Sequence, residues 1–281
     1  MQSHLEALRR LAGRYRRAEM QIVRAYFAER RSKRQHIRWL KAQAFKEYAA
    51  IRPLLELLAV YHARIDSEVD RHEFEEIAEK LAEETKHARL VMDVIEAIGG
   101  KRVKIGDLVR LPEDKKLARV RARYSKTYAA LLHGSKTPSD KEMRRKDEAI
   151  ERAAVTLTEG GGGALYAICV GLRQGAAEKK IAAAFKAIHT DEKDHKDAGA
   201  RRLAPLLRSR RDYERAAEIV CEVSAQRLRM RNEQFGFPLD ADALRALEWR
   251  CRRPSNGAET PQGPLSSRGA AVRAIILRSR K

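Results

Sequence analysis

Two short motifs pair a carboxylate with an imidazole at a spacing that suits one shared metal ion. EETKH contains Glu84 and His87, and DEKDH contains Glu192 and His195. Residues three positions apart share one face of a helix, so each pair could bind a metal ion together. One Glu-x-x-His sequence arises easily by chance. Two of them, each on a long amphipathic helix, favour a metal site inside a helical core.

Both motifs lie on the apolar faces of their predicted helices. At about 100° per residue, Ile77 and Ile95 fall about 20° from Glu84 around the helix axis. Phe185 falls about 20° from Glu192 on the later helix. A buried carboxylate without a partner is costly. Metal ions are therefore the economical explanation for carboxylates that converge in the core.

A site for two metal ions in a four-helix core needs one further glutamate from each remaining helix. Glu159 is the candidate on the third long helix, because a turn midway between it and Glu192 would place both at the same depth. On the first long helix Glu47 lies in the apolar stripe and is preferred. Glu56 lies on the opposite side and stays the alternative, since Pro53 can kink the helix and shift its phase.

The candidate metal ligands are therefore four carboxylates and two imidazoles. Four carboxylates would neutralise two divalent ions, and hard oxygen ligands with some nitrogen suit iron or manganese. The set is Glu47, Glu84, His87, Glu159, Glu192 and His195.

The elements that would carry these residues are helices. Of the 281 residues, 43% are hydrophobic and 6% are aromatic, and many good helix formers without β-branched runs predict an all-α protein. This order of helix pair, long crossover and helix pair is the connectivity of a four-helix bundle with one long crossover. Periodicity predicts long helices at about 35–66, 74–98, 140–175, 177–206 and 212–234, and a short one at about 113–133 within the basic connection 101–138.

Three segments are expected along the chain. Residues 1–34 form a basic amphipathic N-terminal arm, expected to be a helix that lies on the main domain because its apolar residues follow helical spacing. Residues 35–235 form the di-metal bundle. Residues 236–281 form a short C-terminal helix and a basic tail, and the Pro-, Gly-, Ser- and Arg-rich end, 254–281, is expected to be disordered.

The motif E-E-x-x-H followed about a hundred residues later by D-E-x-x-H resembles the ferritin-like di-iron carboxylate superfamily. Within it, DEKDH looks more like the oxygenases, desaturases and N-oxygenases than the iron-storage ferritins. The resemblance covers roughly residues 36–208 and implies a ferritin-like bundle that holds two iron ions. It implies that Glu84 and Glu192 bridge the irons, with Glu47 and Glu159 as terminal ligands.

Two further residues are candidates for a part in the chemistry. The resemblance implies that Asp191 accepts a hydrogen bond from the ring N–H of His87, which would fix the imidazole tautomer; an exposed helix acid is the alternative. Tyr166 lies on the same helix face as Glu159. It is either a redox-active or hydrogen-bonding phenol near the metals or a core tyrosine.

The leading functional expectation is a di-iron oxidase or oxygenase, with a mixed manganese–iron site as a variant, that activates O₂ to oxidise an organic substrate. A ferroxidase or other iron-handling protein is the alternative, as is a rubrerythrin-like peroxidase without a rubredoxin domain. A third interpretation is a basic nucleic-acid-binding helical protein whose site is inactive.

The charge of the chain bears on its partners. Lys and Arg number 59 and Asp and Glu 39, which gives a formal net charge of +20. Such a surface attracts polyanions and acidic proteins, so an acidic electron donor such as a ferredoxin, an acyl-carrier protein or tRNA is expected as a partner. Compositional bias without a specific partner fits equally well. A homodimer is left open as an assembly.

Three cysteines and the lack of long apolar runs bear on the compartment. Cys169, Cys221 and Cys251 lie far apart and form no C-x-x-C motif, which excludes a zinc ribbon or rubredoxin module. An odd number of thiols suits a reducing compartment. The N-terminus has no signal-like apolar region, and no apolar run approaches the ~18 residues of a membrane span. A cytoplasmic protein is expected.

Overall fold

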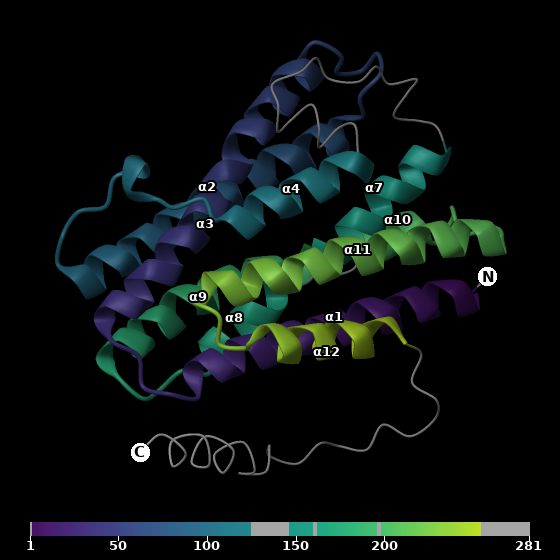
Figure 1. Ribbon diagram of the computed structural model, residues 1–281. Helices are drawn as coiled ribbons and strands as arrows, with labels where there is room; N and C mark the ends of the chain where they lie inside the picture. Colours follow the sequence, from purple (N-terminus) through teal and green to yellow (C-terminus); the bar gives the residue numbers. More distant parts are fainter. Residues whose placement is uncertain (1, 125–145, 160–161, 196–197, 254–281) are drawn as a thin grey trace.

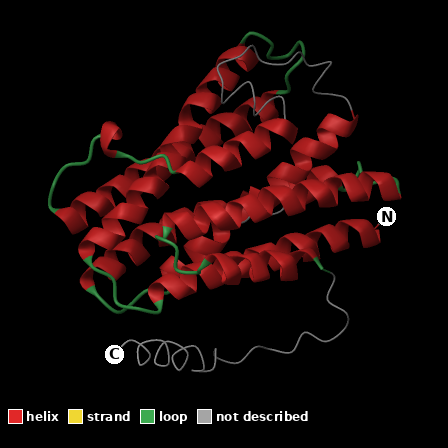
Figure 2. Ribbon diagram, viewed as in Figure 1, coloured by secondary structure: helices red, strands yellow, loops and turns green. Residues whose placement is uncertain are grey.

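The computed structural model describes residues 2–124, 146–159, 162–195 and 198–253. These ranges consist of helices and their connections and contain no strand (Figure 2). The predicted all-α class is therefore confirmed for this part of the chain. The predicted disordered tail at 254–281 lies outside the described residues.

Eleven helical segments make up the described ranges (Figure 1). In chain order they are α1 (Gln2–Phe27), α2 (Lys33–His62), α3 (Arg71–Gly99), the short 3₁₀ helix η1 (Ile105–Asp107), α4 (Pro112–Tyr124), α7 (Lys146–Glu159), α8 (Gly162–Val170), α9 (Ala176–His195), α10 (Ala198–Leu203), α11 (Arg210–Gln234) and α12 (Ala241–Arg252).

The predicted helices agree with these bounds at several ends and differ at others. The first, second and fifth long helices correspond to α2, α3 and α11. The third is described as two helices, α7 and α8, on either side of residues 160–161, and it ends at Val170 instead of Gly175. The fourth is likewise described as α9 and α10. The start of the third helix and the end of the short one lie outside the described residues.

Local sequence signals set the ends of α2 and α3. Ser32 forms a capping box with Gln35, because each side chain accepts a hydrogen bond from the other's backbone N–H. Asp70 caps the start of α3 by accepting from the backbone N–H of His72. Gly100 ends α3 in the left-handed conformation at φ 70°, a conformation that costs glycine nothing. These caps fix where the α2–α3 hairpin begins, where its second helix starts after the turn, and where it ends.

The helices pack in two connected groups. α2 pairs with α3, α3 lies against α9, and α9 lies against α8. α1 packs on α8 and α11, while α11 also contacts α4 and α7. The arm predicted at 1–34 is thus largely a helix on the body of the protein, with Leu8, Leu11 and Ile22 fully or almost fully buried. The boundary near residue 34 stays a prediction.

One cluster of buried side chains lies between α2, α3, α8 and α9. Its largest side chains include Trp39, Phe185 and Leu165, which are at most 1% exposed. The buried part of α2 runs from His36 to Glu47, and that of α3 from His87 to Ile98. The remainder of the α2–α3 hairpin contains no buried helix residue, so the part of the predicted core stripe beyond Glu47 is corrected to a half-buried face.

One stretch, Glu148–Val170, is long and apolar enough to cross a membrane by length and composition alone, and it runs across residues 160–161. The prediction that no apolar stretch is long enough to span a membrane is therefore wrong for this segment. Of its most apolar window 71% is buried inside the protein. Its apolarity is therefore accounted for by its place in the core.

α10 approaches α7 closely enough to require a glycine. A Cβ added to Gly199 would lie 2.6 Å from the backbone Cα of Leu157, a distance that real Cβ atoms essentially never show. Because the clash is with backbone, no side-chain rotation can relieve it. Leu157 lies two residues from Glu159 and Gly199 lies four residues from His195. The contact therefore helps to position the ends of α7 and α9.

Gly199→Ala is predicted to destabilise the protein by about 1–3 kcal/mol, since the added methyl group must push two backbones apart. Gly106→Ala is the matched control, because a Cβ there meets nothing within 4 Å, and it should change the free energy of unfolding by less than about 0.5 kcal/mol. Urea unfolding measures both. Equal stability of the two variants would contradict the close packing of α7 and α10.

Candidate metal centre

Three predicted ligands lie together between α2 and α3. Glu47, Glu84 and His87 each offer a ligand atom, and these three atoms all lie within 4.8 Å of one another. Glu47 is 5% exposed and His87 is 1% exposed, while Glu84 is half-buried. The α2–α3 hairpin therefore brings carboxylates and an imidazole into one buried place.

The structure distinguishes between the two glutamates considered on α2. Glu56 pairs with Arg52 at 2.7 Å, and its side chain is 40% exposed. Pro53 lies inside α2 without ending the helix, and Glu47 stays on the face that meets α3. Glu47 is thus the α2 carboxylate that the fold places beside Glu84.

The two ring nitrogens of His87 lie in different surroundings. Nε2 lies 3.0 Å from Asp191 Oδ2 on α9. Because an ionised carboxylate only accepts hydrogen bonds, Nε2 carries a proton, and in the neutral imidazole Nδ1 then keeps a lone pair. Nδ1 is buried and has no hydrogen-bond partner, and it lies 4.0 Å from Glu192 Oε1.

This unsatisfied nitrogen tests whether a metal fits. A buried acceptor that faces carboxylate oxygens is costly, and a bound cation would satisfy His87 Nδ1 and the nearby carboxylates at once. The donor set of oxygens and one imidazole nitrogen suits iron, manganese or zinc. The residues present therefore fit a metal ion on the Nδ1 side of the ring.

Asp191 has the position that the resemblance implies. Its carboxylate also accepts from Lys86 Nζ at 2.9 and 3.1 Å. Burial alone would raise the pKa of Asp191, but the hydrogen bonds from Lys86 and His87 and the charge of Lys86 outweigh it and lower the pKa. Asp191 is thus held as an anion that orients the ring of His87.

Tyr166 reaches the same group from α8. Its hydroxyl donates to Glu47 Oε1 at 3.0 Å, and the side chain is 4% exposed. Burial raises the pKa of the Tyr166 phenol well above its usual value, and the charges of Glu47, Glu192 and Glu84 raise it further. The phenol is therefore a proton donor at neutral pH, and it contacts a candidate ligand.

A glutamine that the sequence did not single out holds Glu47 from the other side. Gln43 Nε2 donates to Glu47 Oε1 at 2.5 Å. Gln43 Oε1 accepts from Arg231 at 3.3 Å and from Gln234 at 3.0 Å. Since Arg231 can only donate, the oxygen of Gln43 must face it and the amide N–H must face Glu47. Two donors on Oε1 leave the second oxygen of Glu47 for a metal.

This buried chain of hydrogen bonds continues to α1. Arg231 donates to Glu19 Oε1 at 2.6 Å, and both side chains are 2% exposed. Arg231 also donates to Gln234 Oε1, whose amide N–H groups donate to Gln43 and to the Trp39 carbonyl. Four polar side chains outside the motifs thus position one candidate ligand. These four residues belong to no sequence motif. The only signal in the sequence is a charged residue, Glu19, on the apolar face of its helix.

The structure describes only the backbone of Glu159 and His195. Glu159 is the last residue of α7 and His195 the last residue of α9. Their side chains lie outside the described residues, so their part as ligands stays a prediction. Glu192 is placed close to His87 but is not part of the tight group of Glu47, Glu84 and His87.

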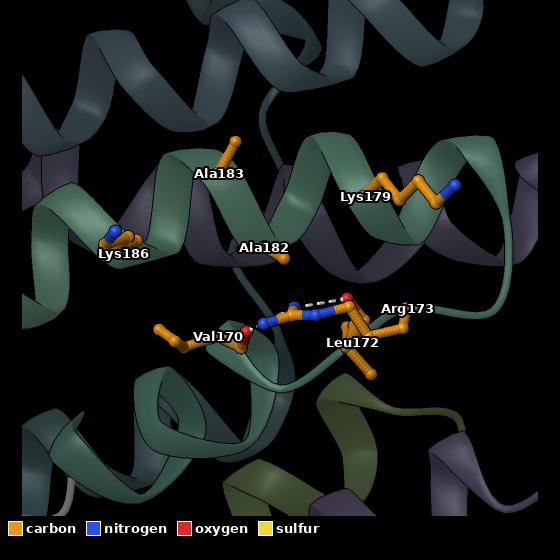
Figure 3. A pocket seen from close by; sticks show the side chains of 7 residues that line it. All are labelled: Val170, Leu172, Arg173, Lys179, Ala182, Ala183 and Lys186. Carbon is orange, nitrogen blue, oxygen red and sulfur yellow. Dashed lines mark hydrogen bonds between the residues drawn. The ribbon is translucent and has the colours of Figure 1, made fainter.

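A surface hollow of about 490 Å³ lies where α8 turns into α9 (Figure 3). Its lining is mainly apolar, and Arg173 donates to the backbone carbonyls of Val170 and Leu172 beside it. None of the candidate ligands whose side chains are described lines it: the described lining residues are Val170, Leu172, Arg173, Lys179, Ala182, Ala183 and Lys186. The hollow is separate from the candidate metal centre.

Comparison of the chain with protein-family models, with curated proteins and with solved structures finds no match.

Asp191→Asn is predicted to weaken metal binding by about 10- to 100-fold, because the amide no longer secures the His87 ring as a charged acceptor does. Asp93→Asn is the control, since Asp93 lies on α3, the helix that carries His87, but forms an exposed pair with Arg89. Calorimetric titration with Mn²⁺ measures both affinities. Equal affinities in the two variants would contradict the orienting part of Asp191.

Arg231→Met is predicted to cost about 3–5 kcal/mol of stability, since it leaves the buried carboxylate of Glu19 without its partner. Adding Glu19→Leu should restore most of that loss, because the unpaired charge is then gone. Urea unfolding of the single and double variants measures the difference. A double variant no more stable than the single one would refute this pairing.

Proposed function

We propose that this chain is a di-iron, or manganese–iron, carboxylate oxidase or oxygenase that uses O₂ to oxidise an organic substrate. The observation that carries the proposal is the close group of the buried Glu47 and His87 and the half-buried Glu84, with His87 Nδ1 unsatisfied and Nε2 hydrogen-bonded to Asp191. This is the arrangement expected of a histidine that ligates a metal through Nδ1 and is oriented through Nε2.

The proposed scaffold is a ferritin-like four-helix bundle. Its first pair would be α2 and α3, and its second pair would be α7–α8 and α9–α10, joined by a crossover that includes α4. Support comes from the packing of α3 on α9 and of α8 on α9, and from the bond between Tyr166 on α8 and Glu47 on α2. The repeated Glu-x-x-His motif places one candidate pair in each half.

The chain's own residues would divide the work at this site. Glu47, Glu84, His87 and Glu192 would hold metal, and the prediction adds Glu159 and His195. When bound, iron or manganese would supply the one-electron redox chemistry that O₂ activation needs. Tyr166 donates a hydrogen bond to Glu47 and thereby fixes which oxygen of that carboxylate faces the site.

Apolar side chains around the group would keep the chemistry away from water. Leu165, Phe185 and Ile188 are fully buried in the cluster that holds Tyr166. A dry site strengthens the interaction between carboxylates and cations and protects reactive species from side reactions. The positive charge of the surface supports an acidic partner, for which an electron donor, an acyl-carrier protein and tRNA are candidates.

Metal content after anaerobic loading tests the proposal. Wild-type protein should hold about two iron ions per chain, and Glu84→Ala/Glu192→Ala should hold almost none because each half-site loses a carboxylate. Glu56→Ala is the control, since Glu56 pairs with Arg52 at the exposed side of α2, and its metal content should equal that of wild type.

The fate of O₂ then separates an oxygenase from an iron-handling protein. An oxygenase should consume O₂ in proportion to an oxidised organic product and reducing equivalents. A ferroxidase would instead consume O₂ in proportion to added Fe²⁺ and release ferric iron. Wild-type protein that retains no iron or manganese after loading would refute the metal-site proposal altogether.

A further inference from the structure

A continuous series of aromatic rings leads away from the candidate metal centre. The ring of Tyr166 lies 5.8 Å from that of Phe185, and Phe185 lies 5.7 Å from Trp39. All three side chains are at most 4% exposed. Tyr166 contacts Glu47 through its hydroxyl, so the series begins at a candidate ligand.

The series continues beyond Trp39 toward the end of α1. Trp39 lies 5.1 Å from Phe235, and Phe235 lies 4.6 Å from Tyr26, measured between ring centroids. The guanidinium of Arg31 lies over the Tyr26 ring at 4.6 Å. Ring-to-ring contact is therefore unbroken from Tyr166 to the connection between α1 and α2.

Trp39 has a proton acceptor within reach. Its indole N–H donates to His36 Nδ1 at 3.4 Å, and His36 Nε2 lies 3.2 Å from Glu178 Oε1. Since Nδ1 accepts, the ring proton of His36 sits on Nε2 and faces Glu178. An oxidised indole is far more acidic than a neutral one, so its proton can move to His36 and return on reduction. This partner makes Trp39 suited to reversible one-electron oxidation.

The series ends beneath a strongly basic surface. Between residues 24 and 38 the chain has six arginines and lysines and one glutamate. Glu29 pairs with Arg31. The other five cations are exposed, and none is paired with a carboxylate among the described residues: Arg24, Arg30, Lys33, Arg34 and Arg38. We name this surface, residues 24–38 at the α1–α2 connection, the basic corner (Figure 1).

We propose that the basic corner docks an acidic one-electron carrier protein, and that Trp39 relays each electron through the ring series to the metal centre. This inference rests on the proposed function, since it assumes a redox metal at the site. Unpaired cations attract an acidic partner and steer it to the surface above the rings. Electron transfer falls steeply with distance, so closely spaced rings favour this path over saturated side chains.

The electrons and protons of the proposed relay balance. For each electron transferred, the carrier is oxidised by one electron and the metal centre, once oxidised by O₂, would be reduced by one. Trp39 passes one electron toward Tyr166 across Phe185 and receives one from the carrier side. Its indole proton moves to His36 Nδ1 and returns, so Trp39 and His36 end as they began.

Metal-free protein tests the relay without reference to metal binding. A ruthenium bipyridyl photo-oxidant attached at Lys33→Cys would be oxidised by flash-quench, and transient absorption would detect a tryptophanyl radical. The chain has two tryptophans, and Trp249 is 54% exposed. In a Trp249→Phe background any tryptophanyl radical must therefore arise at Trp39. We expect the tryptophanyl radical signal to persist in Trp249→Phe. In Trp39→Phe the same signal should fall at least tenfold. Its loss in Trp249→Phe would overturn the relay.

Docking is tested separately with an acidic [2Fe–2S] ferredoxin as the probe. Arg30→Glu/Arg34→Glu should weaken its binding to metal-free protein at least tenfold at low salt. Arg210→Glu/Arg211→Glu is the control of equal charge change. It lies at the other end of the molecule, because α11 begins beside His4 and ends beside Tyr26. Equal loss in both variants, or no binding by wild type, would overturn the docking site.

The outcomes of these two tests do not depend on whether the proposed function is correct. A protein that binds iron but shows neither Trp39 oxidation nor charge-specific docking would refute this inference alone. A protein that passes both tests but holds no metal would refute the proposed function.

Discussion

The hydrogen bond between His87 and Asp191 is the interaction on which the candidate site depends. It ties α3 to α9 through the buried ring of His87 and places a proton on His87 Nε2. The other nitrogen is consequently left as an unsatisfied acceptor that faces carboxylates. A fold that buries such a group must compensate for it, and a cation is the compensation that the surrounding ligands are suited to bind.

The remaining helices serve to hold that arrangement in register. α1 and α11 do not carry candidate ligands, yet Glu19 and Arg231 orient Gln43, which in turn orients Glu47. α8 supplies Tyr166 to the same carboxylate. Glu47 is thus held by two donors from two different helices. Such a carboxylate has little freedom to rotate, and this preorganisation favours metal binding over a flexible surface cluster.

Much of the site could be predicted from the sequence because two repeated motifs lie on helical faces with clear apolar periodicity. That periodicity also places Glu47 on the inner face of α2, which the structure confirms as a position next to Glu84. Periodicity did not predict Gln43, Arg231 or Glu19, because their contacts join helices far apart in the chain. It also overestimated the core of the α2–α3 hairpin beyond Glu47, since amphipathic spacing does not show how far neighbouring helices extend.

An anomalous difference map at the iron absorption edge, from crystals of anaerobically iron-loaded protein, would show whether His87 Nδ1 and the carboxylates around it bind metal. We predict peaks bounded by His87 Nδ1 and the carboxylates of Glu47 and Glu84, with Asp191 still hydrogen-bonded to Nε2. Peaks only at surface carboxylates, or a His87 ring turned so that Nδ1 faces Asp191, would contradict this prediction.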